Sequence, residues 1–142
     1  MKSQNISNHA RFVPLYHFVA LLGSLFLLVG AIVNLVKTSE ENLYDASLLA
    51  FGALLLLLTV FYARVFALKA QDRAIKAEEN FRHYVLTGKV MDSKLTVRQI
   101  IGLRFASDEE FIELSKKAVA ENLSEKEIKK SIKNWKADNY RV

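Results

Sequence analysis

Three histidines are the first residues to consider for metal or acid–base chemistry, and they are widely separated. His9, His17 and His83 lie in different segments, and none follows another at the three- or four-residue spacing with which one helix face binds a metal. The chain has no cysteine, which excludes disulfides, thiolate metal sites and cysteine nucleophiles. We therefore expect no metal ion and no cofactor.

One pair of residues has a spacing suited to acid–base catalysis. Glu79 and His83 are four residues apart in a segment rich in helix formers, so they would share one helix face. A histidine base oriented by a carboxylate could act there, but no nucleophile or oxyanion donor accompanies the pair in the sequence. We weigh three functional hypotheses for this chain, and a membrane-bound enzyme that uses this pair ranks last. We therefore expect the chain not to be an enzyme.

Two charged clusters could bind ions or polymers. The first, Ser107 to Glu110, is acidic, and the preference of helix N-termini for acids explains it without Mg²⁺. The second is a run of lysines at helical spacings, which is interpreted first as a solvated face and second as a contact with anionic headgroups. Interleaved glutamates and the lack of a stacking platform argue against nucleic acid. The lysines of this run are Lys126, Lys129, Lys130, Lys133 and Lys136.

The elements that would position these residues begin with two long uncharged apolar blocks. Residues 12–36 contain no charged residue, and residues 46–63 repeat the feature with five consecutive leucines. About 20 apolar residues cross the roughly 30 Å hydrocarbon core of a bilayer. We predict an all-α fold built on a two-span transmembrane helical hairpin. A polar arm, residues 1–11, precedes it, and a short acidic external loop, residues 37–45, joins the two spans.

The sign of the charge alternates along the chain. Residues 1–36 carry a net charge of +2, residues 37–45 carry −2, and residues 64–142 carry +5. Lysine and arginine gather at the cytoplasmic ends of membrane spans, so both termini should face the cytoplasm. We expect four basic residues just after the second span to contact lipid headgroups: Arg64, Lys69, Arg73 and Lys76.

Small residues predict where the two spans touch, because close approach replaces the hydrophobic driving force in lipid. They are Gly23, Ser24, Gly30, Ala46, Ala50 and Ala53. After the second span, helix formers continue through residues 64–88, and Gly88 is the expected left-handed stop. An apolar stripe in this extension would pack on either the C-terminal helices or a second copy of the chain: Ala70, Ala74, Ala77, Phe81 and Tyr84.

The remaining tail, residues 89–142, predicts three short helices. Thr96 can cap the first, while Ser107 with Glu110 and Ser124 with Glu127 have the spacing of capping boxes that open the second and the third. The third helix would carry Ile128, Ile132 and Trp135 on one face. We expect a small apolar core, completed by Phe81 and Tyr84 from the long helix.

Several strings in the chain resemble a known family. They are the N-H-x-R of Asn8–Arg11, the Q-D-R of Gln71–Arg73, the Y-x-L-T-G-K of Tyr84–Lys89, the L-R-F-A-S-D-E-E of Leu103–Glu110, the stretch Glu121–Trp135, and Asp138 with Arg141 and Val142. Together they are similar to small, uncharacterised two-span bacterial membrane proteins that form a domain of unknown function. The resemblance implies the two-span architecture and the helical tail, with no known activity, cofactor or substrate. For a bacterial protein with both termini in the cytoplasm, we expect the location to be the inner membrane.

The leading hypothesis is a membrane-anchored interaction or assembly module. The expected interaction cluster consists of Arg104, Phe105, Asp108, Asn122, Trp135, Asp138 and Arg141. The second hypothesis is a transport or channel component in which a ring of hairpins points Ser24, Asn34 and Thr59 at a lumen, although neither span carries the Asp, Glu, Lys or Arg residues that line most pathways. The expected partners are anionic lipid headgroups, an unknown protein and a second copy of the chain.

Overall fold

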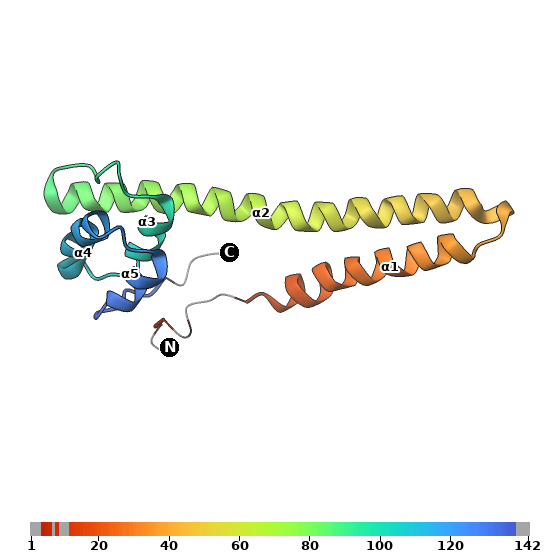
Figure 1. Cartoon of the computed structure of the whole chain (residues 1–142), viewed down its shortest axis with the longest axis horizontal. Coiled ribbons are helices and arrows are strands. Elements are labelled where there is room, and N and C mark those ends of the chain that lie inside the picture. Colours follow the sequence, from red (N-terminus) through yellow and green to blue (C-terminus); the bar gives the residue numbers. More distant parts are fainter. Residues whose placement is uncertain (1–3, 7, 9–11, 139–142) are drawn as a thin grey trace. The chain divides into compact units, whose positions relative to one another are not determined.

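The computed structural model describes residues 4–6, 8 and 12–138 (Figure 1). All regular elements among these residues are helices, and the only β-structure among them is one isolated β-bridge. They divide into two compact units. We call Phe12–Ala67 the hairpin unit, and we call Leu68–Val142 with the N-terminal residues the tail unit. The prediction of an all-α fold with two long apolar helices is confirmed.

The hairpin unit begins with a short π-helix, η1 (Leu15–Leu21), that continues into α1 (Leu22–Lys37). Pro14 stands immediately before η1 with helical dihedral angles, at a position where its missing N–H costs no hydrogen bond. The first apolar helix was expected over residues 12–36. It starts at Leu15 instead, because the proline sets where the helix can begin.

The turn of the hairpin is shorter than expected. Thr38 and Ser39 are extended, one 3₁₀ turn follows as η2 (Glu40–Asn42), and α2 (Leu43–Thr87) then begins. The acidic residues expected in a nine-residue loop instead occupy the 3₁₀ turn and the first turn of α2. Carboxylates there interact favourably with the positive end of the helix dipole, which explains why α2 starts before Ala46.

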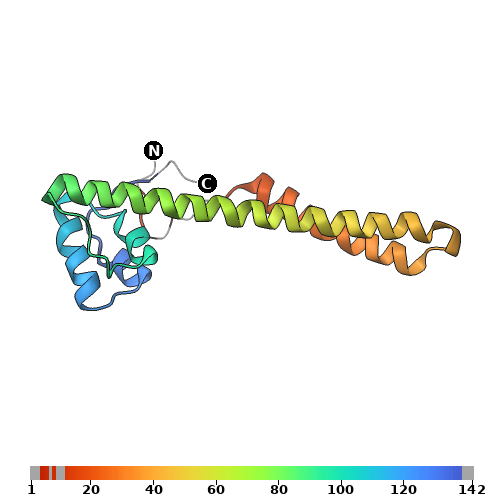
Figure 2. The same ribbon diagram turned by 90° about the horizontal axis from the view of Figure 1, so that it is seen from above.

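Within the hairpin unit, α1 and the first part of α2 run antiparallel (Figure 1; Figure 2). The buried and half-buried residues recur at alternating spacings of four and three: Ser24, Leu28, Ala31 and Leu35 on α1, and Ala46, Ala50, Ala53, Leu57 and Val60 on α2. This is the seven-residue repeat of a coiled-coil seam. Alanine and serine at its most buried positions let the two backbones approach closely.

The long helix α2 ends where the sequence predicts. Its 45 residues run through Thr87, and Gly88 follows with a φ of 71°. The Gly88 N–H donates to the carbonyl oxygen of Tyr84 at 2.7 Å, which closes the last turn. A left-handed residue with this bond is the αL form of helix termination, which glycine adopts without steric cost.

The tail unit packs three further helices against the C-terminal part of α2: α3 (Val97–Leu103), α4 (Asp108–Ala120) and α5 (Glu125–Ser131). All three lie on the same side of α2 (Figure 1; Figure 2). Phe105, Phe111, Ile100, Leu103 and Ile128 are its largest fully buried side chains. At Gly102, an added Cβ would lie 3.2 Å from the carbonyl oxygen of Glu125. Glycine therefore allows the close approach of α3 and α5.

The three tail helices begin as predicted, but only two of the proposed caps form. Thr96 makes a capping box with Gln99, and Ser124 makes one with Glu127. Ser107 stands at the N-cap of α4 without a side-chain capping bond, so the predicted box with Glu110 is wrong. Glu110 instead accepts hydrogen bonds from the backbone N–H groups of Lys133 and Asn134, at 3.1 and 3.0 Å.

Two predictions about the tail core are wrong. The third helix ends at Ser131, so Trp135 lies in an extended segment and pairs with Ala106 in a β-bridge. In addition, Phe81 and Tyr84 are exposed, at 69% and 54%, and α2 contributes Ile75 to the core instead. The tail helices cover the face of α2 that carries Ile75, Glu79 and Arg82, because that face offers Arg82 as a multiple hydrogen-bond donor.

Candidate interaction site

The contact between α2 and the tail helices centres on Arg82. Its Nε donates to an Asp108 carboxylate oxygen at 2.7 Å, its Nη1 donates to Glu79 at 3.1 Å, and its Nη2 donates to the Ala106 carbonyl oxygen at 2.7 Å. The guanidinium carbon also lies 4.3 Å from the centroid of the Phe111 ring. The side chain is 11% exposed. A planar cation with five donors suits such a site, since one group satisfies acceptors from α2, from the α3–α4 turn and from α4.

Glu79 is the acid most strongly affected by this arrangement. It is 8% exposed on the face of α2 that the tail helices cover. Burial raises the pKa of its carboxyl, and the hydrogen bond and charge of Arg82, together with the charge of Lys136, partly offset that rise. Glu78 raises the pKa of Glu79 slightly further. The negative charge of the buried Glu79 carboxylate is thus stabilised mainly by Arg82.

The predicted interaction cluster is partly assembled around Phe105. Arg104 Nη1 lies 3.1 Å from Asp138 Oδ2, and the Arg104 guanidinium carbon lies 4.6 Å from the Phe105 ring centroid. The rings of Phe105 and Trp135 are 5.0 Å apart between centroids. Lys129 Nζ lies 5.3 Å from the same phenyl ring. Four of the seven predicted residues therefore contact one another, with a fully buried phenyl ring at the centre.

The other three predicted residues lie elsewhere. Asp108 belongs to the Arg82 site described above. Asn122 has a φ of 48° and follows α4, where the Leu123 N–H donates to the Ala118 carbonyl oxygen at 3.1 Å. That pattern is a Schellman motif, so Asn122 terminates a helix and does not join the cluster. Arg141 falls outside the described residues.

Main-chain hydrogen bonds hold the C-terminal segment in place beside this cluster. Lys136 N–H donates to the Phe105 carbonyl oxygen at 2.8 Å, and Ser107 N–H donates to the Asn134 carbonyl oxygen at 3.1 Å. The Gln4 side chain accepts from the Asp138 N–H at 2.7 Å and donates to its carbonyl oxygen at 3.3 Å. An N-terminal residue thus extends the same edge.

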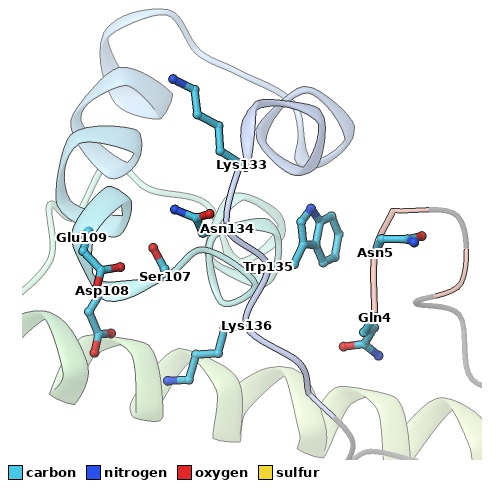
Figure 3. Close-up of a pocket in the computed structure, with 9 residues that line it drawn as sticks. All are labelled: Gln4, Asn5, Ser107, Asp108, Glu109, Lys133, Asn134, Trp135 and Lys136. Atoms are coloured by element: carbon cyan, nitrogen blue, oxygen red, sulfur yellow. The ribbon is translucent and has the colours of Figure 1, made fainter. Parts of the chain in front are cut away.

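An open groove of about 640 Å³ lies along this edge (Figure 3). Its lining combines acids, lysines and an indole, contributed by the start of α4, the C-terminal segment and the N-terminal arm. The residues are Gln4, Asn5, Ser107, Asp108, Glu109, Lys133, Asn134, Trp135 and Lys136. A wide, shallow groove with charges of both signs suits a polypeptide better than a small enclosed ligand.

Two exposed acids near helix starts have lowered pKa values. The Ser107 hydroxyl and a backbone N–H lower the pKa of Glu109. The Ser124 hydroxyl and N–H, as capping partners, lower the pKa of Glu127. Among the described residues, no group of three or more histidine and acidic side chains is placed to hold a metal ion.

The residues assigned to lipid and to helix packing occupy varied positions. Lys69, Arg73 and Lys76 are exposed on α2, while Arg64 is half-buried with its guanidinium carbon 5.7 Å from the Tyr16 ring. Of the predicted packing residues, Ser24, Ala46 and Ala53 are buried and Ala50 is half-buried. Gly23 and Gly30 are exposed, with no atom within 4 Å of an added Cβ.

The polar residues behind the two weaker hypotheses make local contacts. Ser24 Oγ donates to the Leu21 carbonyl oxygen at 2.9 Å, and Thr59 Oγ1 donates to that of Leu55 at 2.8 Å. Asn34 is exposed. His83 Nδ1 lies 2.7 Å from the Lys89 carbonyl oxygen, while Glu79 is engaged by Arg82. The proposed pairing of Glu79 with His83 is therefore absent among the described contacts.

Sequence reasoning missed the residues that make long-range polar contacts. Arg82, Glu110 and Gln99 are the main ones, since Gln99 also donates to the carbonyl oxygens of Ala118 and Leu123, at 3.2 and 2.9 Å. Each has a partner at least 19 residues away in the sequence. The one available signal was the position of Gln99 three residues after Thr96, which is the spacing of a capping box.

The comparison with known families gives one match. A family model, described as a family of unknown function (DUF6526), matches residues 1–142. The chain belongs to this family. Comparisons with curated proteins and with solved structures find no match. Membership agrees with the expectation of a family of unknown function, and it adds no activity.

Proposed function

We propose that the chain is an integral protein of the bacterial inner membrane, whose hairpin unit anchors the tail unit at the cytoplasmic surface as a protein-interaction module. One observation carries the anchoring. Two helical stretches, Leu15–Lys37 and Glu40–Thr87, are long and apolar enough to cross a membrane, and only 11% of the most apolar window of each is buried. A core helix of a soluble protein would be mostly buried.

The outward residues of the hairpin are large and apolar. Phe26 is 71% exposed, Val36 79% and Phe51 58%. Exposing a continuous surface of this kind to water costs roughly 25 cal/mol per Å², whereas lipid tails accept it without that cost. Away from its two ends, a helix pairs its own backbone N–H and C=O groups, which is the condition for a segment that crosses the hydrocarbon core.

The tail unit has features of a docking module. Its core is small and well packed, and its edge carries the groove with acids, lysines and Trp135 (Figure 3). Main-chain hydrogen bonds hold the backbone segments that line this groove, and a rigid groove of this kind favours binding of a polypeptide.

Orientation and anchoring can be tested with single cysteines, because the chain has none of its own. Ser39→Cys lies in the hairpin turn and Lys94→Cys lies in the tail unit. In intact cells, a membrane-impermeant maleimide should label Ser39→Cys and should label Lys94→Cys only after lysis. Protein released from membranes by alkaline carbonate, or equal labelling of both cysteines, would contradict the proposal.

The interaction role is tested by co-purification from native membranes in mild detergent. Lys133→Glu reverses a charge in the groove, and Lys130→Glu makes the same change on the exposed side of α5. A co-purifying protein should be lost with Lys133→Glu and retained with Lys130→Glu. A partner retained equally by both variants, or no partner with the native chain, would contradict the role assigned to the groove.

A further inference from the structure

The tail helices leave one face of α2 uncovered, and that face is apolar. It consists of Ala70, Ala74, Ala77, Phe81 and Tyr84, which we call the α2 stripe. All five residues are exposed, and the neighbouring Val85 is 66% exposed. An α-helix turns about 100° per residue, so Tyr84 lies about half a turn from Ile75 in the tail core, nine residues earlier. The α2 stripe and the covered face of α2 are therefore opposite.

The spacing of the α2 stripe is that of a coiled-coil seam. Its members alternate at four and three residues, which keeps an apolar row facing one partner helix over two heptads. The alanines permit close approach of the partner, and Phe81 and Tyr84 supply large contact areas at one end. The seam inside the hairpin unit has the same spacing, and there the row is already covered by a helix.

The charges beside the α2 stripe fit a particular partner. In a parallel two-stranded coiled coil, the residue before one seam position faces the residue five positions later on the other helix. Arg73 precedes Ala74, and Glu78 follows Ala77, so these two residues are five positions apart and opposite in charge. Both side chains are exposed, and neither forms an ion pair with another described residue of its own chain.

We propose that the α2 stripe pairs with the α2 stripe of a second copy of this chain as a parallel two-stranded coiled coil. Twofold symmetry forms the Arg73–Glu78 contact twice, once from each copy. In an antiparallel pair the flanking rows meet their own kind, so Arg73 has no Glu78 opposite it. The proposal rests on the proposed function, because two chains inserted in one membrane with the same orientation extend α2 in the same direction.

Crosslinking in native membranes tests the pairing and its direction. Ala77→Cys and Ala70→Cys should each give a disulfide-linked dimer under mild oxidation. Lys76→Cys, which is also exposed but lies outside the α2 stripe, should give little. Only a parallel arrangement brings Ala70 beside its own counterpart, since an antiparallel pair places it near Tyr84. Equal crosslinking at Lys76 and Ala77, or none at Ala70, would overturn the proposal.

Charge exchange tests the assignment of Arg73 and Glu78. In a quantitative dimer assay of the full chain in detergent, Arg73→Glu and Glu78→Arg should each weaken association roughly fivefold, as expected for two exposed ion pairs turned into repulsions. The double variant should restore association, because both contacts re-form with reversed sign. Single variants without effect, or a double variant weaker than either single one, would overturn the proposal.

A third variant distinguishes the possible occupants of the face. Phe81→Glu should abolish dimers while leaving Trp135 fluorescence unchanged, since Phe81 faces away from the tail core. If Ala77→Cys is shielded from maleimide in vesicles at every protein density without forming dimers, lipid covers the face and the proposal is wrong. The labelling of Ser39→Cys and Lys94→Cys is independent of these variants. It therefore separates a failure of the coiled coil from a failure of membrane insertion.

Discussion

Arg82 is the residue on which docking of the tail helices against α2 depends most. Replacing it by methionine keeps much of the apolar contact with Phe111 but leaves Glu79 buried without its cation. Removing one partner of a buried pair costs about 3–5 kcal/mol. We expect Arg82→Met to lower the free energy of unfolding of the tail unit by that amount. Urea titration of the full chain in detergent measures it through Trp135, the single tryptophan.

The matched control removes both charges at once. Glu79→Leu combined with Arg82→Met replaces the pair by apolar side chains, so no buried charge is left without a partner. The double variant should be clearly more stable than Arg82→Met alone, although Asp108 and the Ala106 carbonyl oxygen still lose a donor. If the double variant is less stable than Arg82→Met alone, the buried Glu79 does not need the cation of Arg82. The role given to Arg82 in stabilising Glu79 would then be wrong.

The raised pKa of Glu79 also predicts that the stability of the tail unit depends on pH. Burial raises the pKa of its carboxyl above the ordinary value of 4.5, so the folded tail unit takes up this proton more readily than the unfolded chain. Its stabilising contribution is complete below pH 4.5 and is lost as the pH rises through the higher folded value. Glu109 and Glu127 have lowered pKa values and act in the opposite sense.

The contribution of Glu79 is therefore measured as a difference. We expect Glu79→Gln, which retains a hydrogen-bond acceptor for Arg82, to gain stability relative to the native chain as the pH rises from 4.5 to neutrality. Unfolding by urea at several pH values, followed by Trp135 fluorescence, gives the difference between the two proteins at each pH. A difference that is constant over this range would contradict the raised pKa.

Asn122 illustrates a backbone requirement at a single residue. With a φ of 48°, it occupies the left-handed position of the Schellman motif after α4. Asn122→Val should destabilise the tail unit by about 1–2 kcal/mol, since a β-branched residue is strained there. Asn122→Gly should be close to neutral, because glycine adopts this conformation freely. Equal losses for both variants in urea titration would point to a side-chain role for Asn122 instead.

At the scale of the elements, two serines at helix starts are expected to behave differently. Ser124 caps α5 through a reciprocal box with Glu127, whereas Ser107 precedes α4 without a side-chain capping bond. Ser124→Ala should cost about 1 kcal/mol of stability. Ser107→Ala should cost clearly less in the same urea titration. A larger loss at Ser107 would contradict the geometry at the start of α4.

The elements that could be predicted from the sequence are those fixed by local chemistry. Gly88 marks the end of a helix through its own backbone preference, and Thr96 and Ser124 mark helix starts through caps with residues three positions later. The two apolar helices follow from composition alone. Each of these signals lies within a few residues of the feature it specifies, and the predictions that rest on them agree with the structure.

The elements that could not be predicted depend on distant partners. The end of α5 at Ser131 is set by Glu110 of α4, which accepts hydrogen bonds from the N–H groups of Lys133 and Asn134. The choice of the Ile75 face of α2 over the Phe81 face is set by the acceptors that surround Arg82. Helical periodicity predicted only the face with Phe81 and Tyr84, and periodicity does not say which face of α2 meets the tail. That assignment needs the three-dimensional positions of Asp108 and the Ala106 carbonyl oxygen.

Across the whole molecule, the same seven-residue spacing occurs with two different surroundings. In the hairpin unit, the row that includes Ser24, Ala31, Ala46 and Ala53 is covered and the remaining apolar surface faces outward. In the tail unit, the α2 stripe is open, and the exposed charges of Arg73 and Glu78 lie beside it. The first pattern suits a helix pair in lipid, and the second suits association of helices in water. Both patterns agree with the charge distribution, which has basic flanks and an acidic turn.

The basic residues that follow the proposed second span give a final prediction about orientation. Lys69, Arg73 and Lys76 lie within the 15–20 residues of a span end where positive charge influences topology. Changing all three to glutamine should produce a fraction of molecules with the tail outside, in which Lys94→Cys reacts in intact cells. The same loss of charge at Lys116, Lys126 and Lys130, which are farther along the chain, should leave the tail protected. Equal exposure in both triple variants would show that the basic residues near the span do not direct insertion, and the cytoplasmic assignment of the tail would lose its physical basis.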